Sequence, residues 1–310
     1  MHLFVYSDFS AAARAELTRQ LPAGLDVEFA TDRHSAQPPA ALQTAGLLLG
    51  NPPASWLTPL PPQLRFWQID SAGIHQYQEL RPDFLVANMG DLFAWPCAET
   101  MVAGLLALLR GVPQLAVWQT RRHWEGGAFR QRLGVLRGRR VLVLGRGSIG
   151  LAVAQQLVGF GCAVQFVART DPQAQLHTHA EVLATLPATD IVVNCLPGSA
   201  TGYVSAELLA ALPPHALYAS VGRGSTTDEP ALLAALQAGR LAGAVLDVTA
   251  QEPLPSDNPL WGLPQVLLTQ HTGGGYPEEE ADRMKVFLRN LGHWQRGEPL
   301  ENAVTLGRGY

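Results

Sequence analysis

The chain has 310 residues, of which 47% are hydrophobic and 15% charged, and its formal net charge at neutral pH is −4. This length allows two domains with separate cores, and the charge excludes a strongly basic surface of the kind that binds nucleic acids or anionic membranes. The three cysteines, Cys97, Cys162 and Cys195, are widely spaced, which argues against a zinc site or a disulfide framework and favours a reducing, cytoplasmic location.

The first ninety-odd residues are expected to form a small α/β domain. Short apolar runs predict strands over residues 3–6, 46–49, 65–69 and 85–87, and a helix is expected over residues 11–20. Because no basic segment precedes the first predicted strand, we expect no secretory signal peptide.

A strongly apolar stretch then predicts one long helix over residues 96–117. It is too apolar on all sides for a surface helix, so we expect it to be buried between domains or against a second subunit. The polar residues 121–127 that follow are interpreted as a solvated loop in preference to a ligand contact.

The next stretch carries a glycine-rich turn between an apolar run, residues 141–144, and a helix expected over residues 151–158. Gly145 permits a tight turn, Gly147 would let the backbone approach a pyrophosphate, and Gly150 would let the helix pack on the strand. A pyrophosphate would then bind at the helix N-terminus, where N–H groups are free. The pattern predicts dinucleotide binding, with a purely structural turn as the alternative. The loop comprises Gly145, Arg146, Gly147, Ser148, Ile149 and Gly150.

Beyond this turn, strand and helix patterns alternate regularly. Strands are expected over residues 164–167, 191–194, 217–220, 243–247 and 266–268, and helices over residues 180–186, 205–212 and 228–238. Such alternation predicts a doubly wound parallel sheet of the Rossmann type, with ligands at the carboxyl ends of its strands. A last helix is expected over residues 278–296, ending at Gly297.

Three of these strand ends carry an ionisable side chain in a turn. Arg223 lies between two glycines, Glu252 follows Asp247 in the next loop, and His271 precedes a run of glycines. Each alone has a structural explanation, as a surface arginine, a loop acid or a capping histidine.

Together, in this order and spacing, Arg223, Glu252 and His271 resemble the catalytic residues of the D-isomer-specific 2-hydroxyacid dehydrogenases. The resemblance covers nearly the whole chain and is densest over residues 223–229 and 243–254. It implies a dinucleotide-binding domain, residues 96–276, inserted in a split substrate domain made of residues 1–95 and 277–310. It also implies a homodimer, as does the apolar stretch at residues 96–117.

The resemblance and the chemistry of the side chains together suggest roles for the three residues. His271 would donate a proton to the substrate carbonyl oxygen, because histidine side chains titrate near neutral pH. Glu252 would hydrogen-bond the other ring nitrogen, orient the ring and favour its charged form. Arg223 would hold the substrate carboxylate or carbonyl oxygen through its planar set of donors. Asp247 is expected to contact the nicotinamide carboxamide.

The resemblance also implies the remaining contacts. The backbone N–H groups of Ala72, Gly73 and Ile74 would receive the substrate carboxylate, and Asn51 either lines the substrate cleft or only forms an Asn-Pro turn. Further cofactor contacts are implied for Cys195, Leu196, Pro197, Val221, Gly222, Gly273 and Gly274.

The position that selects the cofactor departs from the pattern of NAD-specific members. Where they carry an aspartate that binds the ribose 2′-hydroxyl, this chain has Ala168, followed by Arg169 and Thr170. Without the acid, a 2′-phosphate is not repelled, and an arginine can pair with it. We therefore expect NADP to be preferred, with NAD possible. Asp171, which precedes a proline, is expected to point elsewhere.

The expected activity is the NADP(H)-dependent reduction of a 2-oxo acid, with glyoxylate or hydroxypyruvate as the leading substrates. We expect no metal, no nucleic acid partner and no membrane association. Two alternatives stay open: a dinucleotide-sensing, corepressor-like binding protein of the same fold, and an activity like that of phosphoglycerate dehydrogenase.

Overall fold

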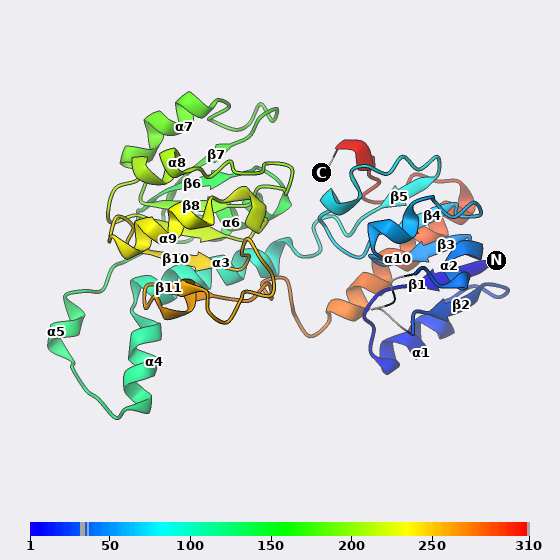
Figure 1. The fold of residues 1–310 in the computed structure, drawn as a ribbon, viewed down its shortest axis with the longest axis horizontal. Helices are drawn as coiled ribbons and strands as arrows, with labels where there is room; N and C mark the ends of the chain where they lie inside the picture. The colour runs from blue at the N-terminus through cyan, green and yellow to red at the C-terminus, as the bar shows by residue number, and fades with distance from the viewer. Residues whose placement is uncertain (32–34, 36, 309–310) are drawn as a thin grey trace. The chain divides into compact units, whose positions relative to one another are not determined.

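The computed structural model of the protein describes residues 1–31, 35 and 37–308, and it divides into two compact units (Figure 1). The terminal unit combines Met1–Phe93 with Tyr276–Tyr310, and the central unit is Ala94–Gly275. These limits lie one or two residues from the expected domain boundaries. Each unit is built around its own parallel sheet.

The terminal unit has a five-stranded sheet in the order β2-β1-β3-β4-β5. Its strands are β1 His2–Val5, β2 Asp26–Phe29, β3 Leu47–Leu49, β4 Phe66–Gln68 and β5 Leu85–Ala87. Its helices are α1 Ala11–Gln20, α2 Ala40–Thr44 and α10 Glu279–Arg296. Apolar clusters cover both faces of the sheet. The sequence patterns predict all of these elements except β2 and α2.

Helix α10 belongs to the terminal unit through buried polar bonds as well as apolar packing. Its Asn290 side chain is fully buried, donates to Gln68 Oε1 at 2.8 Å and to the Glu301 carbonyl at 3.0 Å, and accepts from the Glu301 N–H at 2.7 Å. Arg283 on the same helix donates to both carboxylate oxygens of Asp70, at 2.9 and 3.0 Å. Buried polar groups need such partners, so these bonds fix the position of α10 against the sheet.

The central unit has a six-stranded sheet in the order β11-β10-β9-β8-β6-β7, with every neighbouring pair parallel. The strands are β6 Arg140–Leu144, β7 Ala163–Val167, β8 Ile191–Asn194, β9 Leu217–Ser220, β10 Gly243–Leu246 and β11 Val266–Leu268. Chain order reverses at β6, which has β7 on one side and β8 on the other. Ligands of such sheets bind at this switch point, outside the carboxyl ends of the strands.

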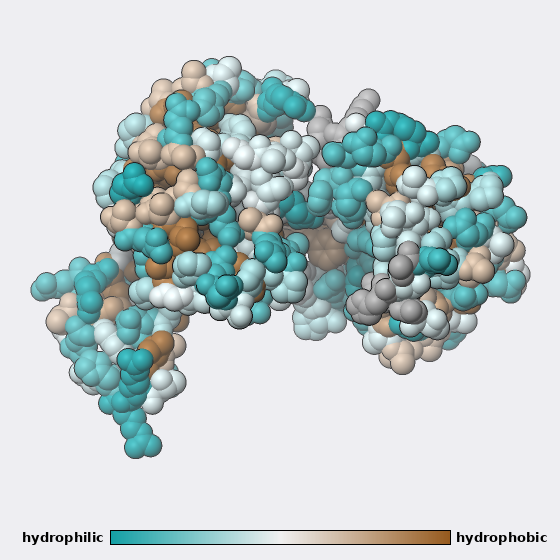
Figure 2. Space-filling view, in the orientation of Figure 1, coloured by the Kyte–Doolittle hydropathy of each residue, from teal (hydrophilic) through white to brown (hydrophobic). Residues whose placement is uncertain are grey.

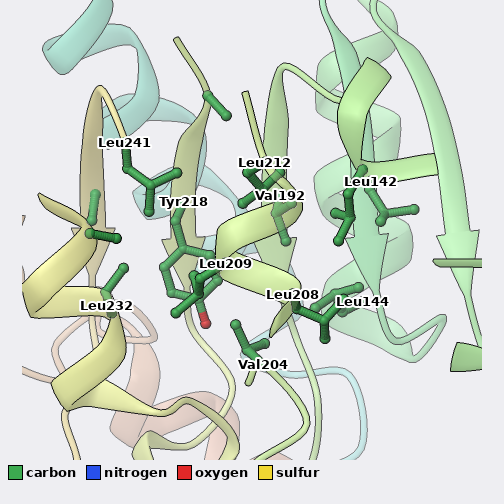
Figure 3. Close-up of a cluster of buried hydrophobic side chains, with 14 of the residues drawn as sticks. Leu142, Leu144, Val192, Val204, Leu208, Leu209, Leu212, Tyr218, Leu232 and Leu241 are labelled. Carbon is green, nitrogen blue, oxygen red and sulfur yellow. The ribbon is translucent and has the colours of Figure 1, made fainter. Parts of the chain in front are cut away.

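Helices cover both faces of the central sheet. The helices α7 His179–Thr185, α8 Ala206–Ala211 and α9 Glu229–Gln237 pack on one face, over the apolar cluster that Figure 3 shows around Tyr218, Leu208 and Leu209. The helices α3 Ala94–Leu109 and α6 Ser148–Val158 pack against each other and against strands of the sheet. Side chains alternate between faces along a strand, so Ala244 and Leu246 join the cluster while Val245 contacts Gly104 of α3. The doubly wound α/β fold predicted from the sequence is confirmed.

Three helices of the central unit start at side-chain caps. The Ser205 hydroxyl accepts from the N–H of Leu208, and the Asp228 carboxylate accepts from the N–H of Ala231, so α8 and α9 begin one residue after the expected positions. Thr178 and Glu181 form a reciprocal capping box at the start of α7.

The prediction of one continuous helix over residues 96–117 is wrong, because the chain bends near its middle. The chain forms α3 and then α4 Val112–Thr120, bent by 67° at a break that contains Gly111 in a left-handed conformation, φ 64°. Seven residues of α3 are buried, but none of α4 is, and Val112, Leu115 and Val117 are exposed. With the short helix α5 Gly127–Arg130, α4 projects from the rest of the central unit (Figure 1). The apolar side chains of residues 112–117 are therefore not covered by this chain, and their burial against a second subunit stays a prediction.

No single helix within the described ranges is long and apolar enough to span a membrane; α3 and α4 reach that threshold only when taken together, across their bend.

Candidate active site

The glycine-rich loop has the geometry that a dinucleotide pyrophosphate requires. Gly145 adopts φ 96°, and a Cβ on Gly150 would lie 2.2 Å from the Gly145 carbonyl oxygen, so only glycine fits at that position. A Cβ on Gly147 would meet no atom within 4 Å, so the backbone is open on that side. Helix α6 begins at Ser148, and the N–H groups of its first turn have no acceptor within the helix. These residues fit a pyrophosphate at the helix N-terminus.

His271 and Glu252 are directly hydrogen-bonded. His271 Nδ1 lies 2.6 Å from Glu252 Oε2, with the two side chains 48% and 35% exposed. The other carboxylate oxygen of Glu252 accepts from the N–H of Thr249 at 3.0 Å. His271 and Gln270 both have positive φ, 56° and 54°, in the turn after β11. The bond to Nδ1 fixes the ring and leaves Nε2 facing away from Glu252.

Arg223 follows β9 and lies at the same edge of the central sheet. Its backbone is extended, and a Cβ on the neighbouring Gly224 would lie 1.8 Å from the carbonyl oxygen of Thr249. Glycine is therefore required for the Arg223 loop to abut the loop that carries Glu252. Burial lowers the pKa of the Arg223 guanidinium, and Glu252 is the foremost of the nearby groups that oppose this shift.

Asp247 organises the turn that carries His271. Its Oδ1 accepts from Thr269 Oγ1 at 2.6 Å and from the N–H groups of Thr272 and Gly273 at 3.1 and 3.0 Å. Its carbonyl oxygen accepts from the His271 N–H at 2.6 Å. The side chain is 4% exposed. These bonds give Asp247 a structural role beside the cofactor contact expected from the sequence.

The loops after β8 and β9 lie against each other. A Cβ on Gly222 would meet the Leu196 carbonyl oxygen at 2.5 Å, and a Cβ on Gly145 would meet the Cys195 carbonyl oxygen at 3.1 Å. The Val221 N–H donates to the carbonyl of Asn194 at 3.0 Å. Burial raises the pKa of Cys97 to about 12 and also raises that of Cys195, so both are neutral thiols near pH 7. The residues predicted from these loops therefore come together beside the glycine-rich loop.

The loop after β7 carries Ala168, Arg169 and Thr170 next to that region. Ala168 is half-buried, whereas Arg169 and Thr170 are exposed. Asp171 points to Arg146, whose Nη1 donates to Asp171 Oδ2 at 2.6 Å. The sequence predicts that Asp171 points away from the ribose position, and its partner in the structure is Arg146.

The predicted substrate loop lies in the terminal unit, after β4. Its carbonyl oxygens are held: that of Ala72 by Asn88 Nδ2 at 2.7 Å and that of Gly73 by Ser71 Oγ at 2.7 Å. Within the part of the chain that the structure describes, no acceptor meets the N–H groups of residues 72–74. Asn51 Oδ1 accepts from the Asp70 N–H at 2.8 Å, so Asn51 holds the start of this loop.

A pocket of about 410 Å³ adjoins the His271–Glu252 pair in the central unit. It is lined by Leu246, Asp247, Thr249, Glu252, Pro253, Leu254, Trp261, Leu268, Gln270 and His271. Across residues 1–31, 35 and 37–308, no cluster of His, Cys, Asp or Glu has the arrangement of a metal site.

The sequence interpretation missed a buried relay that supports Arg223. Asn194 Nδ2 donates to Thr226 Oγ1 at 2.8 Å, and Thr226 Oγ1 donates to the Arg223 carbonyl at 2.6 Å. Both side chains are fully buried. The available signal was a polar residue closing the apolar run of β8, since buried polar groups are kept where they have partners.

Comparison with known proteins identifies the family. Residues 102–273 match the family model described as D-isomer specific 2-hydroxyacid dehydrogenase, NAD binding domain. A hydroxyphenylpyruvate reductase of Plectranthus scutellarioides is 32% identical over 223 residues, 71% of each chain. Glyoxylate/hydroxypyruvate reductase A of Salmonella newport (strain SL254) is 35% identical over 174 residues, so the match spans about half of each protein, 54% of this chain and 55% of that one.

A solved structure agrees over the full length. The NADPH-dependent glyoxylate/hydroxypyruvate reductase of Sinorhizobium meliloti, crystallised with citrate, superposes with a TM-score of 0.80 at 26% identity, covering 99% of this chain and 98% of that one. The family model covers more than half of the chain, and the fold extends the agreement to both units. The chain belongs to the D-isomer-specific 2-hydroxyacid dehydrogenase family of oxidoreductases.

Proposed function

We propose that the protein is an NADP(H)-dependent 2-oxo acid reductase whose substrate is glyoxylate or hydroxypyruvate. The observation that carries the proposal is the 2.6 Å bond between His271 and Glu252 at the carboxyl edge of the central sheet, the edge that Arg223 also occupies. The names of the Salmonella and Sinorhizobium proteins, both glyoxylate/hydroxypyruvate reductases, support the choice of substrate.

His271 acts as the proton donor in this proposal. Nδ1 is occupied by Glu252, so Nε2 is the atom that delivers a proton to the substrate carbonyl oxygen. Glu252 sets the ring orientation and stabilises the imidazolium form. A bound nicotinamide supplies the hydride.

Arg223 binds the substrate carboxylate or carbonyl oxygen. The fork of guanidinium donors can hold two oxygens in one plane, which a lysine cannot do. The free N–H groups of Ala72, Gly73 and Ile74 are the second carboxylate-binding group, and Asn51 fixes the loop that presents them.

NADP is the preferred cofactor in this proposal. At the end of β7 the chain has Ala168 where an acid would bind the 2′-hydroxyl of NAD, and Arg169 follows it. The glycine-rich loop, Cys195, Leu196 and Pro197 after β8, and Val221 and Gly222 after β9 form the remaining cofactor contacts, together with Asp247, Gly273 and Gly274.

The test is NADPH oxidation with a panel of 2-oxo acids: glyoxylate, hydroxypyruvate, its 3-phospho derivative, pyruvate and bulkier analogues. We expect turnover of glyoxylate or hydroxypyruvate, lost in His271→Ala while NADPH still binds. Binding of NADPH without turnover of any 2-oxo acid would instead favour the corepressor-like sensor. Turnover restricted to the phosphorylated substrate would favour the activity of a phosphoglycerate dehydrogenase.

We further propose that the protein works as a cytoplasmic homodimer. All three cysteines are free, which suits a reducing compartment. The exposed apolar side chains of α4 are the surface on which a second copy would pack, and Figure 2 shows hydrophobic side chains among hydrophilic ones on this projecting segment.

A further inference from the structure

An ion pair joins the glycine-rich loop to the loop after β7. Arg146 Nη1 donates to Asp171 Oδ2 at 2.6 Å, and Arg146 Nη2 donates to the side-chain oxygen of Gln173. The guanidinium carbon also lies 5.5 Å from the centre of the Phe166 ring, within the range of a cation–π contact. The Arg146 side chain is 19% exposed. Three contacts therefore fix one arginine in one orientation.

The Arg146–Asp171 pair joins the two loops that bind the cofactor in dinucleotide-binding folds. The glycine-rich loop binds the pyrophosphate, and the loop after the second strand binds the adenosine ribose. A carboxylate in that second loop binds the 2′-hydroxyl of NAD and repels the 2′-phosphate of NADP. Asp171 is the only acid between Val167, which ends β7, and Leu176.

Both oxygens of Asp171 are engaged. Oδ1 accepts from the Gln173 N–H at 2.9 Å, and Oδ2 accepts from Arg146. The Gln173 bond and then the Arg146 bond lower the pKa of Asp171, with a smaller effect of His177, so the group is a carboxylate at neutral pH. Arg146 compensates the charge of Asp171, and both carboxylate oxygens are used by Arg146 and the Gln173 N–H.

We propose that Arg146 sets the preference for NADP(H) over NAD(H) by holding Asp171 away from the ribose and compensating its charge. Arg146 acts through Asp171, so it is a positioning residue, whereas Arg169 contacts the 2′-phosphate. The inference deepens, and rests on, the proposed NADP(H) preference. Without Arg146, Asp171 is an uncompensated carboxylate in the ribose loop and resembles the acid that NAD-specific relatives carry there.

The test measures binding of two fragments, 2′,5′-ADP and 5′-AMP, by isothermal titration calorimetry. These ligands differ only in the 2′-phosphate and need no substrate or turnover, so the result does not depend on whether a 2-oxo acid is reduced. For Arg146→Leu we expect the Kd of 2′,5′-ADP to rise about tenfold or more, as for an unfavourable like-charge contact. The Kd of 5′-AMP should not rise and can fall, because this ligand has no 2′-phosphate and its 2′-hydroxyl can donate to the released carboxylate.

Companion variants separate this role from others. Arg146→Lys keeps a cation beside Asp171 and should retain the preference, and Arg146→Leu with Asp171→Asn should regain it. Arg140→Leu is the matched control: it removes an arginine at the other end of the glycine-loop strand, where Arg140 pairs with Asp190, and should leave both Kd values unchanged. Circular dichroism of each variant checks that the fold is kept.

Three results would overturn the inference. The ratio of the two Kd values could be unaltered in Arg146→Leu. The double variant could bind 2′,5′-ADP as weakly as Arg146→Leu, which would mean that Arg146 contacts the phosphate itself. The unsubstituted protein could bind 5′-AMP as tightly as 2′,5′-ADP, which would remove the NADP(H) preference and this assignment with it.

Discussion

At the scale of single residues, the candidate site depends on how each ionisable group is held. Glu252 uses one carboxylate oxygen on His271 and the other on the Thr249 N–H, so it is fixed on both sides. His271 in turn is fixed through its own backbone N–H, which donates to the Asp247 carbonyl. The Asp247 carbonyl therefore fixes the backbone of His271, and Glu252 orients its ring.

The charge of Glu252 can be separated from its hydrogen bond. Glu252→Gln keeps an oxygen near Nδ1 but no longer stabilises the imidazolium, so we expect kcat for 2-oxo acid reduction to fall by about 10²-fold. The Kd of NADPH should be unchanged. Steady-state kinetics and fluorescence titration measure the two quantities; an unaltered kcat would show that the acid has no part in proton donation.

Asp190 makes a second residue-scale prediction, concerning stability. This buried carboxylate accepts from the N–H and the guanidinium of Arg140 and from His215, and the Arg140 bond leads in holding its pKa well below the usual range. Because the pKa is lower in the folded protein, the carboxylate stabilises the fold above the unfolded-state pKa of about 3.9, and this contribution is lost as the pH falls toward the folded value.

Asp190→Asn should therefore lower the free energy of unfolding by about 1–3 kcal/mol at pH 7. The difference from the unsubstituted protein should shrink as the pH falls from about 5 toward 3. Urea unfolding followed by circular dichroism at several pH values tests this. A difference that is constant over that range would mean that the charge of Asp190 contributes nothing.

At the scale of elements, the break between α3 and α4 separates a buried helix from an exposed one. A Cβ on Gly111 would lie 2.4 Å from Phe129 Cζ, in addition to the left-handed φ of 64°, so the bend depends on glycine at this position. The apolar side chains beyond it, Val112, Leu115 and Val117, are between 43% and 50% exposed.

Leu115→Arg tests whether these side chains form the dimer surface. A charge buried without a partner at an interface is strongly unfavourable, so we expect the variant to be monomeric where the unsubstituted protein is dimeric. Light scattering after size-exclusion chromatography measures the mass. Gln237→Arg adds the same charge at an exposed position on another helix, α9, and serves as the control, because Gln119 and other residues four positions from Leu115 share its face of α4. An unaltered mass for Leu115→Arg would place the dimer surface elsewhere.

The elements that the sequence predicts best are those with an unambiguous pattern. All six strands of the central sheet are recognisable because they are short apolar runs, and α7, α8 and α9 are recognisable because they start at Thr, Ser and Asp caps. Strand β2 was missed because it is a half-exposed edge strand with two acids, Asp26 and Glu28. The bend was missed although Gly111 and Pro113 are residues that favour a helix break, and the exposure of α4 was missed because apolar composition is the same for a buried helix and an uncovered one.

The same distinction applies to the candidate site. The glycine spacing is local in sequence, and Arg223, Glu252 and His271 could be identified because their order and spacing resemble those of a known family. The bonds of Asp247 to the turn that carries His271 link residues 22 to 26 positions apart. The pairing of Arg146 with Asp171 links residues 25 positions apart. Such pairs depend on which strands are neighbours in the sheet, which no local pattern gives.

At the scale of the whole molecule, the two units differ in whether one continuous segment of the chain builds them. The central unit is one uninterrupted segment with its own sheet and core, whereas the terminal unit needs both ends of the chain. Asn290, Gln68 and Glu301 show the dependence directly, since their bonds join β4, α10 and the segment after it.

The central segment, residues 94–275, should therefore fold when expressed alone and bind 2′,5′-ADP. Its strands and the apolar cluster around Tyr218 are complete without the terminal unit. Thermal melting followed by circular dichroism should show one cooperative transition, stabilised by the nucleotide through its binding energy. A segment that melts without cooperativity would show that its core needs the terminal unit.

The division of the terminal unit has a consequence for how the protein is synthesised. Its first five strands leave the ribosome long before α10, whose Met284, Phe287 and Leu291 complete the apolar cluster on one face of that sheet. The 191 residues from 88 to 278 are translated in between, which at about 5–20 residues per second takes roughly 10 to 40 s. Throughout that interval one face of the nascent sheet is covered only in part, by α1, while the central segment can already fold. The domain that is begun first is therefore the one that is finished last.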